Sequence, residues 1–568
     1  MSKKEFIDFQ NVREIMKYTV DNYPDNIAFT IKNKKDKEIS YRKITYTELS
    51  EEINSFGTAL LHLGLKNKRI AIIGKNRYEW ILSYITTLDG VGIAVPLDKG
   101  LPEQEIITSL QRSKADVIIF EENMIDLMQK IKNEKNTNLS TYILMDNKKV
   151  EGFLNIEELI KLGKDLINHG DTQYIDAEID DNKMSVILFT SGTTALAKAV
   201  MISHRNIASN VAALKYEQPF CSTDTNIAFL PFHHMYGSTC IILMLSAGAN
   251  NVFCDGLRYI ADNLKEYKVS VFVCVPLILE AMHKKIMHVV DKTGQRKKLE
   301  FGKKLSKMLL KIGIDARRKI FKSILDELGG EVRAVISGAA ALNPQVAEDF
   351  NAWGIYTVQG YGLTETAPVV SGENIHTLGY NSCGKPLCNV EIKIENPNAD
   401  GIGEIAVKGP NVMLGYYENE EATNAVLKDG WFYTGDLGYL GKKGHLYIAG
   451  REKSVIVLKN GKNIYPEELE TVISQLPYVA ENMVFGYPKG DDLIISAKIV
   501  YNKEYFKDAT KEEIEFKIWN DIKQINLGLT TFKHIKKIIV TDEPMIKTTT
   551  AKVKRFQEIE KILKENKI

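Results

Sequence analysis

VILFTSGTTALAK, residues Val186–Lys198, joins a short apolar run to a polar loop. The run Val186–Phe189 has the length and the apolar character of a buried strand. The nine residues that follow it, Thr190–Lys198, contain four hydroxyl side chains, a glycine and a lysine. Hydroxyl and backbone N–H groups in such a loop can cradle phosphate oxygens, and a lysine adds positive charge. A Ser/Thr-rich surface turn has the same composition, so composition alone leaves both interpretations open.

Similar apolar runs recur along the chain and alternate with helical patterns. The helical spacing of Leu49, Ile53, Phe56, Leu60 and Leu63 ends at Gly64, which is a helix stop. The strand-like runs are Ile70–Ile73, Ile93–Val95, Val117–Phe120, Val186–Phe189, Val269–Val275 and Val332–Ile336. This alternation predicts an α/β fold with buried, largely parallel strands.

Three polar, glycine-containing loops directly follow strand-like runs. They are Thr190–Lys198, Pro231–Gly237 and Gly338–Ala341. Ligands of open α/β sheets bind outside the carboxyl ends of the strands. The sequence therefore places its most unusual loops where a site is expected.

The length of 568 residues predicts at least two domains. We expect a large domain of α/β sheets over residues 1–451. Within it, residues from about 379 to 450 alternate short strand-like runs with Gly, Pro and Asn turns, which predicts a small antiparallel β region. The remaining residues, 452–568, suit a small, mobile α+β C-terminal domain.

Composition excludes several classes of protein. The net charge of +1 lacks the basic excess that is typical of a nucleic-acid-binding domain. Residues Met1–Gln10 have no apolar signal-peptide core, and no stretch reaches the roughly 20 apolar residues that span a bilayer. Six scattered cysteines without a CxxC pair indicate reduced thiols. We therefore expect a cytoplasmic protein.

A series of motifs resembles the adenylate-forming superfamily of acyl-CoA synthetases, nonribosomal adenylation domains and firefly-type luciferases. The loop Thr190–Lys198 is similar to the signature of that superfamily, and further motifs follow in its order over nearly the whole chain. They are Pro231–Gly237, Gln359–Thr366, Gly403–Tyr417, Trp431–Asp436, Gly450–Lys453, Asn460–Glu468 and Thr548–Arg555. The resemblance implies that ATP activates a carboxylic acid as an acyl-adenylate, which then passes its acyl group to a thiol.

The resemblance also implies which residues bind the nucleotide. Tyr361 would stack on adenine, and Arg451 would contact the ribose at a domain junction. Asp436 would bind both ribose hydroxyls, because an ionised carboxylate only accepts hydrogen bonds. The full implied set is Thr190, Ser191, Gly192, Thr193, Thr194, Lys198, Gly338, Ala339, Ala340, Tyr361, Gly362, Asp436 and Arg451.

Four residues would carry the chemistry. Glu365 resembles a Mg²⁺ ligand, since a hard carboxylate beside ATP phosphates suits that ion. Thr364 resembles the hydroxyl that contacts the α-phosphate, and His234 resembles a histidine near the substrate carboxylate. Lys552 resembles the lysine that offsets charge when a carboxylate attacks phosphorus. Without these motifs, Glu365 would be interpreted as a helix cap and Lys552 as the start of a basic, solvated helix.

The chain departs from the pattern of the superfamily in two loops. Alanine replaces the usual Gly, Pro and Gly at Ala195, Ala197 and Ala199, and the usual Gly before the catalytic lysine is Ala551. Ala197 and Ala199 also exclude a P-loop, which needs a second glycine and a final hydroxyl there. Lys453 matches the residue about which the small domain rotates between the two half-reactions.

The substrate that the resemblance favours is a medium- or long-chain fatty acid, with coenzyme A as the acceptor. The strings Ser337–Leu342 and Asn460–Pro466 resemble long-chain fatty acyl-CoA synthetases. An acyl carrier protein is the alternative acceptor, because the same loops would serve both thiols. A luciferase-like oxidation has no residue in its favour. A non-catalytic nucleotide-binding module is disfavoured because the chain retains Glu365, Asp436, Arg451 and Lys552 together.

The basic stretch Lys284–Lys322 has two interpretations. Phe301, Leu305, Met308 and Ile312 recur at helical spacing, beside the basic residues Lys303, Lys304, Lys307 and Lys311. A helix of this kind can rest on the anionic inner face of a membrane. It can equally pack on the protein body and expose a solvated basic face.

Overall fold

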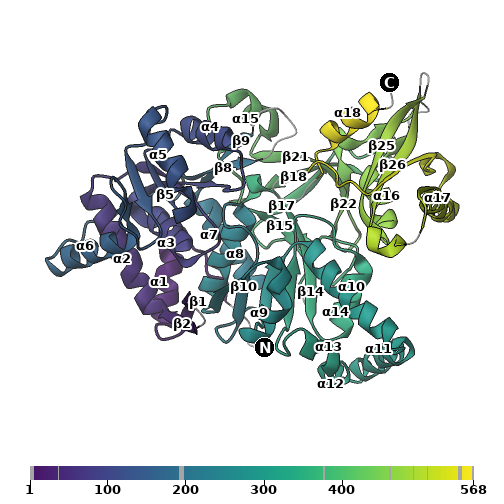
Figure 1. The fold of residues 1–568 in the computed structure, drawn as a ribbon, viewed down its shortest axis with the longest axis horizontal. Helices are drawn as coiled ribbons and strands as arrows, with labels where there is room; N and C mark the ends of the chain where they lie inside the picture. Colours follow the sequence, from purple (N-terminus) through teal and green to yellow (C-terminus); the bar gives the residue numbers. More distant parts are fainter. Residues whose placement is uncertain are drawn as a thin grey trace. The chain divides into compact units, whose positions relative to one another are not determined.

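The computed structural model describes residues 5–35, 38–190, 197–374, 378–459, 462–489, 492–507, 509–547 and 553–565. Its contacts divide the chain into two compact units. The first comprises Met1–Thr190, Ala197–Glu391 and Val407–Phe432, and the second contains Ile392–Ala406 and Tyr433–Ile568. Helices and sheets occur in both units, so the α/β class is confirmed (Figure 1).

The first unit contains a nine-stranded sheet of order β16-β15-β14-β13-β12-β10-β11-β1-β2. The strands from β14 to β1 run parallel to their neighbours, as expected from their apolar runs. Antiparallel strands close both edges. The bounds are β1 (Ile27–Lys35), β2 (Glu38–Thr45), β10 (Thr225–Ala228), β11 (Asn250–Phe253), β12 (Val271–Cys274), β13 (Ala334–Ser337), β14 (Tyr356–Gly362), β15 (Val369–Gly372) and β16 (Lys385–Pro386).

An eight-stranded sheet of order β19-β9-β8-β4-β3-β5-β6-β7 forms the rest of the β structure of this unit. Its strands from β8 to β7 are parallel, whereas β8, β9 and β19 pair antiparallel. The bounds are β3 (Lys68–Ile73), β4 (Gly92–Leu97), β5 (Val117–Phe120), β6 (Thr141–Leu144), β7 (Leu154–Asn155), β8 (Met184–Thr190), β9 (Lys198–Ser203) and β19 (Gly415–Tyr416).

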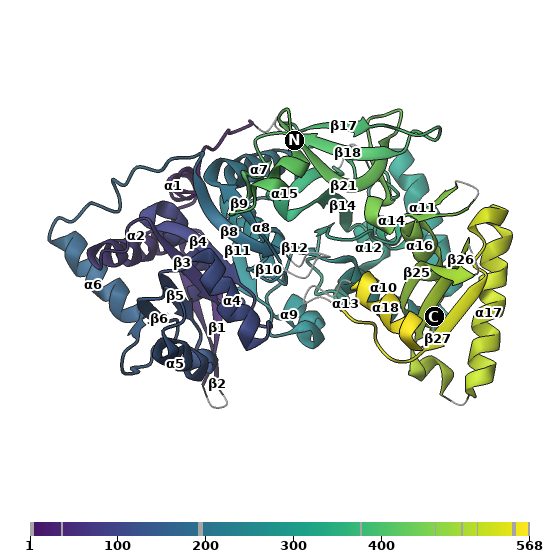
Figure 2. The same ribbon diagram turned by 90° about the horizontal axis from the view of Figure 1, so that it is seen from above.

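Helices α7 (His204–Glu217) and α8 (Met235–Ser246) lie between these two sheets (Figures 1 and 2). Helix α7 contacts β9, and α8 contacts β10 and β11. A helix that is covered on both sides must be apolar nearly all round, and α8 is buried along almost its whole length. The two helices therefore join the sheets into one body.

The remaining helices of the first unit pack on the sheets and on one another. The predicted helix that ends before Gly64 is α2, which begins with a capping box between Thr45 and Glu48. The bounds are α1 (Val12–Asn22), α2 (Tyr46–His62), α3 (Tyr78–Thr86), α4 (Glu103–Ser113), α5 (Ile125–Glu134), α6 (Ile156–Asn168), α9 (Ile260–Glu266), α10 (Pro276–Lys292), α11 (Arg296–Lys311), α12 (Arg317–Ile320), α13 (Lys322–Glu327), α14 (Pro344–Ala352) and α15 (Glu420–Val426).

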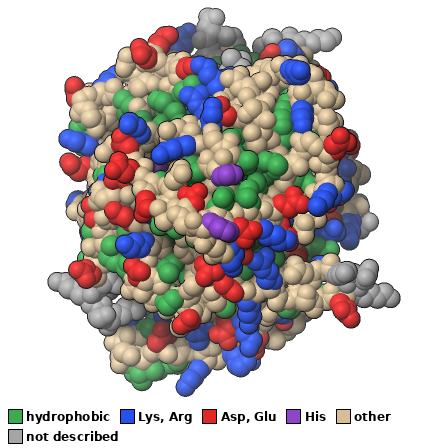
Figure 3. All heavy atoms as spheres, turned by 90° about the vertical axis from the view of Figure 1, so that its left-hand side faces the viewer, with side chains coloured by type: hydrophobic (Ala, Val, Ile, Leu, Met, Phe, Trp, Pro, Cys, Tyr) green, Lys and Arg blue, Asp and Glu red, His purple; other side chains and the backbone are tan. Residues whose placement is uncertain are grey.

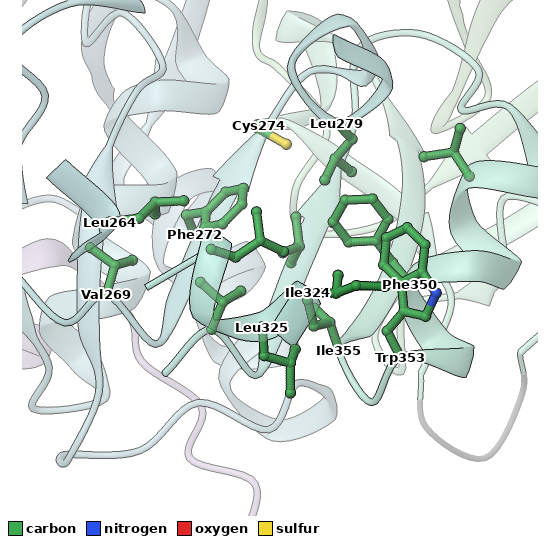
Figure 4. Packing of buried hydrophobic residues seen from close by; sticks show 14 of the residues in the cluster. Leu264, Val269, Phe272, Cys274, Leu279, Ile324, Leu325, Phe350, Trp353 and Ile355 are labelled. Atoms are coloured by element: carbon green, nitrogen blue, oxygen red, sulfur yellow. The ribbon is translucent and has the colours of Figure 1, made fainter. Parts of the chain in front are cut away.

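One apolar cluster packs α10 and α14 against the nine-stranded sheet (Figure 4). Phe350 and Trp353 from the end of α14 are fully buried, as are Phe272 of β12 and Leu279 of α10. Burying each such side chain contributes roughly 1.5–3 kcal/mol. The cluster therefore fixes the strands whose following loops form the candidate site.

A five-stranded sheet has the order β17-β18-β21-β20, with β22 paired to β21. Its strand β21 pairs antiparallel with β20 and with β22, which confirms the antiparallel region in the fold prediction. The bounds are β17 (Glu391–Glu395), β18 (Gly403–Lys408), β20 (Leu427–Lys428), β21 (Trp431–Leu440) and β22 (Leu446–Arg451).

The C-terminal part of the second unit has its own core. A sheet of order β25-β26-β27 packs with α16 and α17 around buried isoleucines. The bounds are β23 (Ile456–Val457), β24 (Asn463–Ile464), α16 (Pro466–Ile473), β25 (Val479–Lys489), β26 (Asp492–Tyr501), α17 (Lys511–Leu527), β27 (Lys537–Thr541) and α18 (Arg555–Glu565). The predicted boundary at Arg451 remains a prediction.

Candidate active site

The hairpin of β8 and β9 joins the two ends of the loop Thr190–Lys198, which the sequence predicts to bind phosphate. Thr190 is the last residue of β8 and pairs with Lys198, the first residue of β9. The Thr190 hydroxyl donates to the Lys198 carbonyl at 3.4 Å. The predicted loop residues Ser191, Gly192, Thr193, Thr194 and Ala195 lie outside the described residues.

Glu365 lies in a single 3₁₀ turn, Thr364–Thr366, directly after β14. The Thr366 hydroxyl accepts a hydrogen bond from the Leu363 N–H at 3.0 Å and donates to the Pro368 carbonyl at 2.7 Å, which closes the turn. A Cβ on Gly362 would lie 1.9 Å from the Pro368 carbonyl oxygen, so glycine is required there. Tyr361, Gly362, Thr364 and Glu365 are all half-buried. The turn thus holds the predicted nucleotide residues at an accessible strand end.

Tyr416 connects the Glu365 turn to the β8–β9 hairpin. Its hydroxyl donates to Glu365 Oε1 at 3.0 Å. Its ring lies under the Lys198 ammonium, with Nζ 4.2 Å from the ring centroid. Burial raises the pKa of Tyr416, and the Glu365 carboxylate raises it further, so the phenol stays protonated. One oxygen of the Glu365 carboxylate is therefore held by the side chain of Tyr416.

The loops after β10 and β13 also meet. His234 is the residue before α8, and its ring lies 4.2 Å from that of His233 between centroids. A Cβ on Gly338 would lie 2.7 Å from the hydroxyl oxygen of Tyr236, so these two loops are in close contact. Ala339 has a φ of 70°, a left-handed conformation that is unusual for alanine, and both Ala339 and Ala340 are exposed.

Parallel strand order explains why these loops come together. β10, β12, β13 and β14 are consecutive parallel neighbours, so their carboxyl ends share one edge of the sheet. His234, Gly338 and Glu365 follow three of those four strands. This is the edge where ligands bind in open α/β sheets.

Asp436 and Arg451 form a pair within the second unit. They are facing partners on β21 and β22, and Arg451 Nε lies 2.8 Å from Asp436 Oδ1. The Asp436 carboxylate is almost fully buried, whereas the arginine is more than half exposed. Asp436 therefore belongs to a strand and is not part of a surface turn. An ionised carboxylate only accepts hydrogen bonds, and it offers about four acceptor positions.

Of the two predicted residues Lys453 and Lys552, the structure describes only Lys453. Lys453 is exposed and lies in the 3₁₀ turn Glu452–Ser454, inside the second unit. Lys552 and Ala551 lie outside the described residues. The chain on either side of them is described, and Lys547 and Val553 form an antiparallel bridge.

The donor set fits a magnesium ion that is bound mainly through a nucleotide. In the described ranges no group of three or more His, Cys, Asp or Glu side chains could hold a metal ion without another ligand. Mg²⁺ in nucleotide sites takes one or two carboxylates together with substrate phosphates and water. Glu365 would supply such a carboxylate, and one of its oxygens accepts from the Tyr416 hydroxyl.

The structure adds two residues to the candidate site that the sequence did not predict, Arg112 and Tyr416. Arg112 of α4 donates to the Ala197 carbonyl at 2.7 Å, and its guanidinium lies 5.3 Å from the Phe189 ring centroid, so it touches both arms of the hairpin. Nothing in the local sequence marks Arg112. Tyr416 lies inside the motif Gly403–Tyr417, but the motif does not show which side chains it reaches.

Comparisons with known proteins identify the family of this chain. The family described as AMP-binding enzyme matches residues 16–417, and the AMP-binding enzyme C-terminal domain matches residues 453–565. Long-chain fatty acid–CoA ligase 5 of Mus musculus is 31% identical over 91% of this chain and 82% of its own length. A chloroplastic long-chain fatty acid–[acyl-carrier-protein] ligase of Arabidopsis thaliana is 25% identical over 98% of this chain and 86% of its own.

Solved structures show the same fold. An anthranilate–CoA ligase in complex with anthranoyl-AMP has a TM-score of 0.79 at 19% identity, over 100% of both chains. A fatty acyl-CoA synthetase of Mycobacterium tuberculosis has a TM-score of 0.64 at 20% identity, over 97% of this chain and 98% of its own. The ordered motifs, the two-sheet fold and the match over most of the chain agree, and this protein belongs to the AMP-binding enzyme family of the adenylate-forming superfamily.

Proposed function

We propose that this protein is an AMP-forming acid–thiol ligase that activates a medium- or long-chain fatty acid. ATP and the acid would give an acyl-adenylate and pyrophosphate, and the acyl group would then pass to coenzyme A with release of AMP. The observation that carries the proposal is the meeting of Lys198 and Glu365 at Tyr416, beside the carboxyl ends of parallel strands. A cation and a carboxylate that contact the same tyrosine suit a nucleotide phosphate chain and its metal ion.

Each step needs a different charge balance. A fatty carboxylate that attacks the α-phosphorus brings two anions together, so the transition state gains negative charge. Lys198 and the proposed catalytic Lys552 would offset that charge, and the Thr364 hydroxyl would donate to an α-phosphate oxygen. Bound Mg²⁺, held by Glu365 and the phosphates, would neutralise developing charge on the departing pyrophosphate.

The remaining proposed contacts orient the substrates. Tyr361 would stack on adenine, with Gly362 allowing the close approach of the chain. Asp436 and Arg451 would bind the ribose. Gly338, Ala339 and Ala340 would line the nucleotide edge, and His234 would lie near the acid carboxylate. The hydroxyls and N–H groups of Thr190, Ser191, Gly192, Thr193 and Thr194 would bind the outer phosphates.

One assay separates the two acceptors. We would measure ATP–pyrophosphate exchange with acids from acetate to oleate, and then thioester formation with coenzyme A or with a phosphopantetheinylated carrier protein. We expect exchange to rise with chain length and coenzyme A to yield the thioester. Exchange without any coenzyme A thioester, together with loading of the carrier protein, would establish the carrier-protein alternative, which the Arabidopsis relative also represents.

We further propose that the protein works in the cytoplasm and that α11 touches the anionic inner face of a membrane. Phe301 and Ile312 are 68% and 67% exposed, and Met308 and Ile314 are also exposed. Helix α11 packs on the body through Leu299, Gly302 and Ser306 instead. Exposed apolar residues beside exposed lysines are typical of an interfacial helix. Among the described helices, none has the length and apolarity to cross a bilayer.

Charge complementarity favours an anionic lipid surface as the partner of this face. Lys304, Lys307 and Lys311 are exposed along the same helix, whereas Lys303 is engaged with the protein body. On the face that Figure 3 shows, by contrast, basic and acidic side chains are interspersed. Nucleic acid is not a proposed partner, since the net charge of the chain is +1.

Liposome binding tests this contact. We expect replacement of Lys304, Lys307 and Lys311 by Gln to weaken binding to phosphatidylserine vesicles and to reduce its salt sensitivity, because each cation near such a surface contributes roughly 1 kcal/mol. Activity on a short-chain acid should not change. The matched control replaces Lys511, Lys517 and Lys523 on α17, which also exposes an aromatic side chain, Phe516. Equal losses in both triple variants would reject α11 as the contact.

A further inference from the structure

Tyr416 is held in place by its backbone on both sides. It is the second residue of β19, which pairs antiparallel with β9 so that Tyr416 faces Val200. The Leu414 N–H donates to the Met201 carbonyl at 2.9 Å, and the Tyr417 N–H donates to the Ala199 carbonyl at 2.7 Å. The Tyr416 N–H itself donates to the Thr423 hydroxyl at 2.9 Å. The side chain therefore has little freedom to move.

The chain just before Tyr416 also holds the Glu365 turn. The Met413 N–H donates to the Glu365 carbonyl at 2.8 Å. Asn411 donates through Nδ2 to the carbonyls of Thr366 and Val369, both at 3.0 Å. The tyrosine and the glutamate thus belong to one hydrogen-bonded assembly, and Tyr416 is only 5% exposed.

We propose that Tyr416 is a positioning residue that holds Lys198 and Glu365 apart while orienting both toward the nucleotide. Its ring face binds the ammonium and its hydroxyl binds one carboxylate oxygen. This inference rests on the proposed function, because it concerns the same ATP and Mg²⁺ site.

The physical reason lies in the opposite charges of the two residues. A lysine and a glutamate that reach the same tyrosine attract each other, and a direct ion pair would neutralise both. A neutral phenol between them satisfies each one separately, through a cation–π contact and a hydrogen bond. With one oxygen of Glu365 engaged by the phenol, the carboxylate is oriented to offer its other oxygen to a cation. Mg²⁺ commonly takes carboxylates in this one-oxygen mode, because it demands near-octahedral geometry.

The test is Tyr416→Phe, which keeps the ring under Lys198 and removes only the hydroxyl. Titration calorimetry would measure ATP binding with and without Mg²⁺. We expect the ATP affinity without Mg²⁺ to stay close to that of the wild type. The increase in ATP affinity that Mg²⁺ causes should be about tenfold smaller, as when an outer-shell partner of a metal ligand is lost. The maximal rate of pyrophosphate exchange should fall with little change in the KM for the acid. Tyr416→Leu removes the ring as well, and should weaken ATP binding even without Mg²⁺.

Tyr417→Phe is the matched control. The Tyr417 hydroxyl accepts from Arg69 Nη1 at 2.8 Å, and its ring lies 4.9 Å from that guanidinium, so this variant also removes a phenol hydrogen bond beside a cation. We expect it to leave the Mg²⁺ effect on ATP binding unchanged. If Tyr416→Phe binds ATP and Mg²⁺ like the wild type, or if both variants lose binding and thermal stability in parallel, Tyr416 is structural and the proposal is wrong.

Failure of this inference can be told apart from failure of the proposed function. The wild-type protein alone decides the function, since it must exchange pyrophosphate with a carboxylic acid. The calorimetric comparison needs only ATP and Mg²⁺, so it still reports on Tyr416 if the acid substrate is of another class.

Discussion

At the scale of single residues, Lys498 and Glu558 form an ion pair inside the second unit, and their side chains are 5% and 1% exposed. The other Glu558 oxygen accepts from the Ile546 N–H at 2.9 Å. Removing one member of such a pair leaves the other as an unpaired buried charge. We expect Glu558→Gln to lower the free energy of unfolding at neutral pH by about 3 kcal/mol, measured by urea denaturation.

The pair of Lys498 and Glu558 also predicts how the free energy of unfolding depends on pH. Burial by itself would raise the pKa of Glu558, but the Ile546 N–H and the Lys498 ammonium outweigh burial and hold the pKa below its ordinary value of 4.5. A depressed pKa stabilises the fold above 4.5, and that contribution is lost as the pH falls through the folded-state pKa. The difference in free energy of unfolding between the wild type and Glu558→Gln should therefore become smaller as the pH falls below 4.5. Glu560→Gln, on the exposed side of α18, should have the same free energy of unfolding as the wild type.

At the scale of elements, helix α11 is anchored by a buried carboxylate of α14. Asp349 is 4% exposed and lies 2.5 Å from Lys303 Nζ and 2.8 Å from His283 Nε2. Burial alone would raise the pKa of Asp349, and the hydrogen bonds from His283 and Lys303 outweigh it and hold the pKa low. We expect Lys303→Gln to lower the free energy of unfolding by about 2 kcal/mol. Lys304→Gln, one residue away and exposed, should unfold at the same urea midpoint as the wild type; equal losses in both variants would reject the anchor.

At the scale of the whole molecule, we predict that the C-terminal domain rotates about Lys453 between the half-reactions. Proline fixes φ near −65° and removes an N–H donor. Lys453→Pro should keep pyrophosphate exchange within about tenfold of wild type, a loss below roughly 1.4 kcal/mol. Thioester formation from isolated acyl-AMP should fall much further. A parallel decline of both steps in Lys453→Pro, at unchanged thermal stability, would place the pivot elsewhere, for example at the unit border beside Tyr433.

Lys552→Ala should have the reverse effect. Pyrophosphate exchange should be lost, whereas thioester formation from isolated acyl-AMP should remain.

Much of the fold and part of the candidate site could be read from the sequence by itself. The apolar runs became β3, β4, β5, β8, β12 and β13, because burial on both faces of a parallel strand requires a continuous apolar run. The polar loops after β8, β10 and β13 could be recognised because turn chemistry is local. The roles proposed for Lys198, Glu365 and Asp436 came from motifs that resemble those of the adenylate-forming superfamily, and they remain predictions.

Only the tertiary structure decided which of these side chains meet and what holds them. Tyr416 reaches Glu365 from 51 residues away, and Lys498 meets Glu558 across 60 residues. Such pairs depend on strand order and register, which spacing along the chain does not encode. The face of α11 was decided in the same way. Its apolar spacing predicted an amphipathic helix. In the structure Lys303 turns toward the buried Asp349, which also pairs with His283, while Phe301 and Ile312 are exposed. The physical reason is that a buried carboxylate is stabilised by cationic partners and not by apolar side chains.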